Sequence, residues 1–259
     1  MSATNSQTCI GIENVSVGYA GREVQTGVTV AIGRGEIFAI VGDSGAGKST
    51  LMRTIVGLLP PLAGRILFEG SDAERHMQDG LPPFGVLFQG GALWTSMTVL
   101  ENVMMPMDLY GYSLPAARPA LARFKLALAG LPGQDSLYPA ALSGGMKKRA
   151  AIARALALDA RVLFLDEPSA GLDPLASRRL DELVLTLREG LGITVVIVTH
   201  ELESLYSIAD RMLFLDGDTH RPAAIGRPLE LARSAASPKV RDFLARRGMT
   251  SADHPEVRP

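Results

Sequence analysis

The sequence predicts an α/β fold: a parallel β-sheet with helices on its faces, an antiparallel β part ahead of it, and a mostly helical insertion within it. Short apolar segments rich in β-branched residues alternate with helical patterns along the chain, and this alternation is typical of parallel sheets. A glycine-rich stretch follows one of these segments and opens a helix, which indicates a loop that holds phosphate groups.

Length, charge and cysteine content restrict the classes of function that the chain can have. The 259 residues suffice for one large domain or two small ones. A net charge of -1 without a broad basic excess argues against nucleic acid as the main partner, because binding a phosphate backbone needs clustered Lys and Arg. Cys9 is the only cysteine, so no disulfide can form within the chain, which fits a reducing compartment. The N-terminus lacks a signal-peptide pattern and no apolar run approaches about 18 residues, so we expect no membrane span.

The N-terminal part of the chain is expected to consist of strands and one helix. The first two strands pair antiparallel through a turn near residues 19–22, and the helix after the glycine-rich stretch ends at Pro60 and Pro61. The expected elements are strands at residues 10–17, 24–32, 35–42 and 64–70 and a helix at residues 49–59.

The composition changes between residues 89 and 141, where Ala, Leu and Met dominate at helical spacing and a helical insertion is expected. After it we expect buried strands at residues 162–167 and 193–200, a helix at 174–189, a last strand at 211–218, and helices around 229–232 and 238–247. The chain then divides into a β part with the first part of the core (1–88), a helical part (89–142), the second part of the core (143–225) and a C-terminal helical extension (226–259).

The glycine-rich stretch is a complete phosphate-binding motif. It matches G-x-x-x-x-G-K-[ST] between a predicted strand and a predicted helix, the context that the motif requires. Backbone N–H groups can converge on phosphate oxygens there, Lys48 is expected to reach the β- and γ-phosphates, and Ser49 to ligate Mg²⁺. The residues expected to bind the nucleotide are Gly42, Asp43, Ser44, Gly45, Ala46, Gly47, Lys48, Ser49 and Thr50.

Two acids end the strand expected at residues 162–167. Where nucleotides are hydrolysed, a first acid holds Mg²⁺ and a second polarises the attacking water. Side chains alternate along a strand, so adjacent acids can take different roles. We therefore assign Asp166 to magnesium and Glu167 to the general base.

Two polar residues follow other predicted strands. Parallel topology puts His200 at the same edge of the sheet as the phosphates, where a neutral imidazole can contact the γ-phosphate. Gln89 begins the helical insertion and can join Mg²⁺ or the attacking water to it. The predicted catalytic residues are Glu167, His200 and Gln89, and the predicted magnesium ligands are Ser49, Gln89 and Asp166.

A second anion site is predicted in the stretch LSGGM. The Ser143 hydroxyl and the N–H groups of Gly144 and Gly145 lie at an expected helix start. The site is expected to be too far from Lys48 to close on the same nucleotide. Two copies placed head to tail resolve this, because each phosphate loop then faces the other chain's Ser-Gly-Gly and two nucleotides are held between them. Met146 completes this expected contact in trans.

In this order, the motifs resemble those of the nucleotide-binding subunit of ABC transporters over about residues 10–220. The resemblance implies a P-loop NTPase with a RecA-like core, ATP and Mg²⁺ as cofactors, and ATP hydrolysis coupled to transport. It identifies Gln89 with the Q-loop, LSGGM with the signature, VLFLDE with Walker B and His200 with the H-loop. It also implies that Tyr19 stacks on adenine and that Asp173, in SAGLD, belongs to the D-loop.

The signature ends in Met146 where the family usually has Gln, and this departure carries further information. Together with FQGGALWTSMTVLENVMMP and DEPSAGLDPLAS, it resembles the ATPase of the Mla-type lipid transporters. That resemblance implies phospholipid transport between the two membranes of a Gram-negative envelope, with a permease, an MCE-domain protein and a small regulatory subunit as partners. The chain would lie at the cytoplasmic face of the inner membrane and touch it through the permease only, with residues 94–107 near the groove that receives the permease.

Other interpretations stay open. The motifs also fit an ATPase subunit for a polar or another hydrophobic solute. They fit a soluble mechanical ATPase less well, because the chain has no second cassette, no long heptad arms and no basic stripe. Lys147, Lys148 and Arg149 fit either contact with phosphate or a solvated helix face. Residues 226–259 exceed what the ATPase core needs, and we expect them to pack on the second copy or on a regulatory partner.

Overall fold

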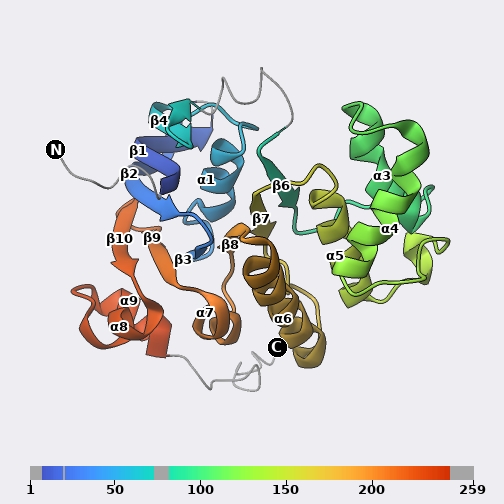
Figure 1. The fold of residues 1–259 in the computed structure, drawn as a ribbon. Helices are drawn as coiled ribbons and strands as arrows, with labels where there is room; N and C mark the ends of the chain where they lie inside the picture. Colours follow the sequence, from blue (N-terminus) through green and yellow to red (C-terminus); the bar gives the residue numbers. More distant parts are fainter. Residues whose placement is uncertain (1–7, 20, 73–81, 246–259) are drawn as a thin grey trace, which may run out of the picture.

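The structure is a computed structural model that describes residues 8–19, 21–72 and 82–245 (Figure 1). A six-stranded sheet has the order β10-β9-β3-β8-β7-β6, and a four-stranded sheet has the order β2-β1-β4-β5. The larger sheet contains β3 (Ile37–Gly42), β6 (Phe84–Leu87), β7 (Val162–Asp166), β8 (Thr194–Val198), β9 (Arg211–Asp216) and β10 (Arg221–Gly226). The smaller sheet contains β1 (Thr8–Tyr19), β2 (Arg22–Gly33), β4 (Ala63–Phe68) and β5 (Ser71–Asp72).

Apart from one helix between β8 and β9, the helices follow the expected order. They are α1 (Lys48–Ile55), α3 (Val99–Leu109), α4 (Arg118–Leu128), α5 (Gly144–Ala155), α6 (Pro174–Leu191), α7 (Leu202–Ile208), α8 (Pro228–Ser234) and α9 (Pro238–Ala245), with short 3-10 turns at Pro115–Ala117 and Pro139–Ala141. Within the part of the chain that the structure describes, no helix combines the length and the apolar character needed to cross a bilayer.

The predicted parallel sheet is confirmed. Strands β9, β3, β8, β7 and β6 run parallel, and β10 adds an antiparallel edge. Residues of β3, β7 and β8 are buried throughout, because both faces of the sheet are covered. One face, including Phe38 and Phe164, packs against α1 and the antiparallel sheet; the other, including Leu163 and Phe214, packs against α6, α7 and α9.

The helical insertion has an apolar cluster of its own. Val103 of α3, Leu126 of α4 and Ala150 of α5 are among its buried members. Figure 1 shows α3 and α4 at the opposite side of the molecule from the antiparallel sheet, with α5 leading back towards β7. The chain therefore places LSGGM on a different body of packed side chains from the phosphate loop.

Details of three elements differ from the sequence prediction. Helix α1 ends at Ile55 rather than at residue 59, because Gly57 adopts a left-handed conformation (φ 75°) and Leu58 N–H bonds the Arg53 carbonyl in a Schellman-type end. Strand β9 is not the last strand, since β10 pairs with it. Helix α7 was not expected. Residues 246–247 of the expected last helix lie outside the described residues.

Candidate nucleotide-binding site

The phosphate loop connects β3 to α1, and two of its glycines are required by close neighbours. A Cβ atom at Gly47 (φ 85°) would lie 2.7 Å from Val24 Cγ1 of β2. A Cβ atom at Gly42 would lie 2.2 Å from the Leu215 carbonyl oxygen of β9. Any other residue would have to displace the Val24 side chain at Gly47 or the backbone of β9 at Gly42, so β2 and β9 restrict the two ends of the loop. Ser44 and Gly45, at its tip, are exposed.

Lys48 lies inside this loop. Its Nζ donates hydrogen bonds to the carbonyl oxygens of Gly42 (2.9 Å) and Asp43 (2.7 Å). Burial lowers the pKa of the Lys48 ammonium, and the nearby charges of Glu167, Asp43 and Asp166 oppose that shift. The result is a partly buried positive charge at the N-terminus of α1, where an anion is also favoured by the backbone N–H groups.

Ser49 and Asp166 meet although they are far apart in sequence. Ser49 Oγ donates a hydrogen bond to Asp166 Oδ1 at 3.1 Å, which joins the start of α1 to the end of β7. Burial raises the pKa of the Asp166 carboxyl, and the Ser49 hydrogen bond opposes that shift. A hydroxyl and a buried carboxylate beside a phosphate loop are the oxygen ligands that suit Mg²⁺, which takes few protein ligands and completes its shell with phosphate oxygens and water. The residues present therefore fit this ion.

Glu167 and His200 form the second junction, at the ends of β7 and β8. His200 Nδ1 lies 2.7 Å from Glu167 Oε2; the Glu167 side chain is 12% exposed and that of His200 62% exposed. The backbone of Glu167 is in the left-handed region (φ 47°), and its N–H donates to the Val198 carbonyl at 2.9 Å. A non-glycine residue held in this strained conformation is typical of functional sites.

Tyr19 and Gln89 lie at the border of the site. Tyr19 ends β1 with its ring half exposed, and its hydroxyl accepts hydrogen bonds from Thr50 Oγ1 (3.4 Å) and Arg53 (3.3 Å) of α1. The Thr50 bond, with that of Arg53, lowers the pKa of the Tyr19 hydroxyl. Gln89 follows β6 and is exposed; its side chain makes no polar contact with Ser49 in the described structure.

The signature residues stand at the start of α5, beside the start of α6. Ser143 is the N-cap of α5 and accepts the Met146 N–H at 3.3 Å. Ser143 and Gly144 are exposed, and a Cβ atom at Gly144 would lie 3.2 Å from Leu172. Asp173 caps α6 by accepting the Ala176 N–H at 2.9 Å. Ser143, Gly144 and Asp173 thus lie on one exposed surface formed by the starts of α5 and α6.

Lys148 has a position that neither sequence interpretation anticipated. It is buried, and its Nζ donates to the carbonyl oxygens of Gln89 and Glu167 (3.5 Å for the latter), joining α5 to the ends of β6 and β7. Burial lowers the pKa of its ammonium. Lys147 is exposed, as a solvated face requires. The apolar residues Ala151 and Ile152, three and four positions after Lys148, were the signal that its side chain lies on the buried face.

The fold and this geometry agree with comparisons to known proteins. The ABC transporter family matches residues 25–170. The chain belongs to this family and is one of its ATP-binding, ATP-hydrolysing cassettes.

The similar proteins are named for the transport of different substrates. The probable ribonucleotide transport ATP-binding protein mkl of Mycobacterium tuberculosis is 33% identical over 91% of this chain and 66% of its own length. Methionine import ATP-binding protein MetN 1 of Rhodococcus jostii is 37% identical over 91% of this chain and 70% of its own. The intermembrane phospholipid transport system ATP-binding protein MlaF of Haemophilus influenzae is 36% identical over 79% of each chain. The chain thus spans just under two thirds of the mycobacterial relative.

Solved structures show the same fold. The cbiO1 protein of Clostridium perfringens, part of the ABC transporter complex cbiONQ, aligns with a TM-score of 0.78 at 30% identity over 87% of this chain and 91% of its own. The ATP-binding cassette MJ0796, in a dimeric post-hydrolysis state bound to ADP and Pi, aligns with a TM-score of 0.73 at 28% identity over 84% of this chain and 98% of its own.

Proposed function

We propose that the chain is the ATPase subunit of a transporter that moves lipid, in particular phospholipid, between the inner and outer membranes. The observation that carries the ATPase part is the meeting of two pairs at one edge of the sheet. Ser49 lies against Asp166 and Glu167 against His200, directly beside the phosphate loop.

Each residue has a proposed role that follows from its place. The N–H groups of residues 42–50 and the Lys48 ammonium bind the phosphates, and the exposed Tyr19 ring stacks on adenine. Ser49 and Asp166, with Gln89, would hold Mg²⁺, and the ion would supply positive charge to the phosphates. Glu167 accepts a proton from the attacking water. His200, whose Nδ1 lies 2.7 Å from Glu167 Oε2, orients that carboxylate and reaches the γ-phosphate.

The second anion site is proposed to act in trans. Ser143 and Gly144 are exposed at the start of α5, and α5 packs on the helical cluster and on the face of the sheet away from the phosphate loop. In a head-to-tail pair, Ser143, Gly144, Gly145 and Met146 of one copy face the nucleotide of the other, and Asp173 lies between the two sites. The dimeric MJ0796 cassette supports pairing of two copies for this fold. The proposed division of the chain is that given above: 1–88, 89–142, 143–225 and 226–259.

The lipid assignment rests on similarity. The relative MlaF is named for phospholipid transport, and the Met-containing signature and the segment after Gln89 resemble that type. We propose a permease, an MCE-domain protein and a small regulatory subunit as partners at the cytoplasmic face of the inner membrane. Residues 94–107 form the permease contact; within them Trp94 is exposed while Val99, Val103 and Met107 are buried. A second candidate is import of a polar solute, which the similarity to MetN favours.

Affinity purification in mild detergent tests the assignment. The tagged chain is isolated from its own cells, and co-purifying proteins and lipids are identified by mass spectrometry. A multi-spanning permease with an MCE-domain protein and bound phospholipid is the expected result. A permease with a solute-binding protein would replace the lipid assignment by the polar-solute one. Ribosomes or DNA-associated proteins without a permease would overturn the transport role.

A further inference from the structure

Helix α9 is fixed to the ATPase core. Phe243 packs edge-on against Phe214 of β9, with ring centroids 5.2 Å apart, and Val240 and Leu244 are fully buried beneath it. The Tyr206 hydroxyl of α7 donates to the Leu244 carbonyl at 2.9 Å. This part of the C-terminal extension therefore packs on its own chain, and it holds its side chains in a defined position.

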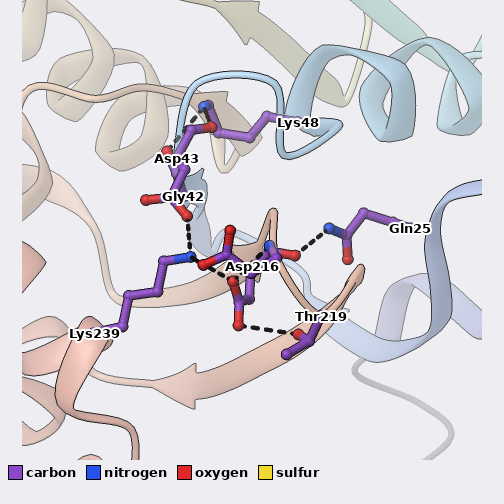
Figure 2. Close-up of polar contacts among 8 residues, drawn as sticks. Gln25, Gly42, Asp43, Lys48, Asp216, Thr219 and Lys239 are labelled. Atoms are coloured by element: carbon purple, nitrogen blue, oxygen red, sulfur yellow. Dashed lines mark hydrogen bonds and ion pairs between the residues drawn. The ribbon is translucent and has the colours of Figure 1, made fainter.

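Lys239, in the first turn of α9, reaches the phosphate loop (Figure 2). Its Nζ lies 2.6 Å from Asp43 Oδ2, 2.5 Å from Asp216 Oδ1 and 2.6 Å from Asp218 Oδ2. Asp216 ends β9, Asp218 lies in the turn after it, and Asp43 is the second residue of the phosphate loop. One ammonium thus pairs with three carboxylates, one in the phosphate loop and two at the end of β9 and in the turn after it.

The carboxylate at the end of β9 is itself held rigidly. The Asp218 N–H and the Thr219 hydroxyl each donate to the Asp216 carboxylate at 3.0 Å, and Gln25 Nε2 donates to the Asp216 carbonyl at 2.9 Å. The Lys239 ammonium, with the Asp218 N–H and the Thr219 hydroxyl, lowers the pKa of Asp216 to about 2. Lys239 is therefore anchored on Asp216, and its ion pair with Asp43 ties the phosphate loop to this anchor.

The negative charge of Asp43 is unfavourable in a loop that binds polyphosphate. Its carboxylate carries the same sign of charge as the nucleotide, and its backbone carbonyl accepts the Lys48 ammonium at 2.7 Å. Without a counter-ion the Asp43 carboxylate would repel the phosphates and would compete with them for Lys48. Lys239 reduces both effects, because it holds the carboxylate against α9 and places a positive charge beside it.

We propose that Lys239 is a positioning residue for the phosphate loop: it holds Asp43 away from the nucleotide and so links the C-terminal extension to ATP affinity. The inference rests on ATP binding at the phosphate loop. It concerns a contact within one chain, so it does not depend on the identity of the transported substrate.

The test measures ATP binding and steady-state kinetics of the full chain for Lys239→Met, Lys239→Arg and Asp43→Asn, and for the double variant. Lys239→Met is expected to raise the Kd and KM for ATP about tenfold, a limited effect because partial exposure of Lys239 screens its charge. The same variant is expected to change kcat less than about threefold. Lys239→Arg is expected to recover most of the affinity. In the Asp43→Asn background, Lys239→Met is expected to change the Kd less than about threefold. Arg233→Met, an exposed cation on α8, is the matched control.

Three results would overturn the proposed role of Lys239. A Lys239→Met chain that unfolds at lower temperature but binds ATP like the unaltered chain would show a purely structural role and overturn the proposal. An equal loss of affinity with and without the Asp43 carboxylate would also overturn it. If the unaltered chain binds no ATP and Lys48→Ala changes nothing, the nucleotide assignment itself is wrong, and the inference falls with it.

Discussion

Replacing Lys148 by methionine removes the charge that joins α5 to the ends of β6 and β7 while keeping an apolar stem of similar length. Lys148 is 7% exposed and donates to the carbonyl oxygens of Gln89 and Glu167. Both carbonyls belong to residues of the proposed catalytic set. The substitution therefore tests whether this one ammonium holds the helical part, the Q-loop and the Walker B end in register.

The size of the effect follows from the two bonds. The Glu167 contact, at 3.5 Å, is long and contributes little. The Gln89 contact is a hydrogen bond from a charged donor, worth about 1.5–3 kcal/mol, and relief of the buried charge offsets part of it. We expect Lys148→Met to lower the free energy of unfolding by about 1–2 kcal/mol and the Tm by about 2–8 °C. We also expect kcat to fall about 10–100-fold through misplacement of catalytic groups, with a smaller change in KM.

Thermal unfolding and ATPase kinetics measure these quantities, and Lys147→Met is the matched control because Lys147 is the exposed neighbour on the same helix. The control is expected to stay within about 0.5 kcal/mol of the unaltered chain. If Lys148→Met and Lys147→Met gave the same Tm and the same kcat, the reasoning about this junction would be refuted.

Two further predictions concern residues outside the nucleotide site. Asn102 is fully buried, and the two N–H groups of its side chain are shared among the carbonyls of Trp94, Met97 and Thr98. Asn102→Ala is therefore expected to lower the free energy of unfolding by about 2–4 kcal/mol and to lower the fluorescence anisotropy of Trp94, the only tryptophan; unchanged anisotropy would contradict this. Burial raises the pKa of Asp181 to about 6 in the folded chain. The contribution of its protonated form to the free energy of unfolding is therefore fully present below about pH 4 and is lost as the pH rises through about 6. Asp181→Asn is therefore expected to raise the free energy of unfolding by about 1 kcal/mol near pH 7.5, after allowance for solvent screening, and to change it little near pH 4; equal effects at the two pH values would contradict this.

The phosphate loop and the acidic strand end could be predicted because their chemistry lies in contiguous motifs between clear strand and helix patterns. The parallel sheet follows from the same apolar segments, and it brings Asp166, Glu167 and His200 to one edge. The direct Glu167–His200 contact could not be predicted, since it depends on the left-handed backbone of Glu167.

Other features escaped the sequence for identifiable reasons. Strand β10, RPAAIG, has little β-branched character and contains Pro222, which only an edge strand accommodates. Helix α1 ends early because Gly57 adopts a left-handed conformation, although Pro60 and Pro61 suggested a later end. Lys239 resembles a solvated helix residue in sequence, and its acidic partners lie far from it along the chain.

The head-to-tail nucleotide sandwich is the central claim, and the molar mass of Glu167→Gln in solution tests it most directly. Slowed hydrolysis, by about 10²–10⁴-fold, keeps ATP bound. Light scattering is expected to show the 27.5 kDa chain without nucleotide and twice that mass with ATP and Mg²⁺. Adding Ser143→Arg is expected to abolish the doubling while each chain still binds ATP. A doubled mass that survives Ser143→Arg, or no doubling with saturating ATP, would contradict the proposed contact in trans.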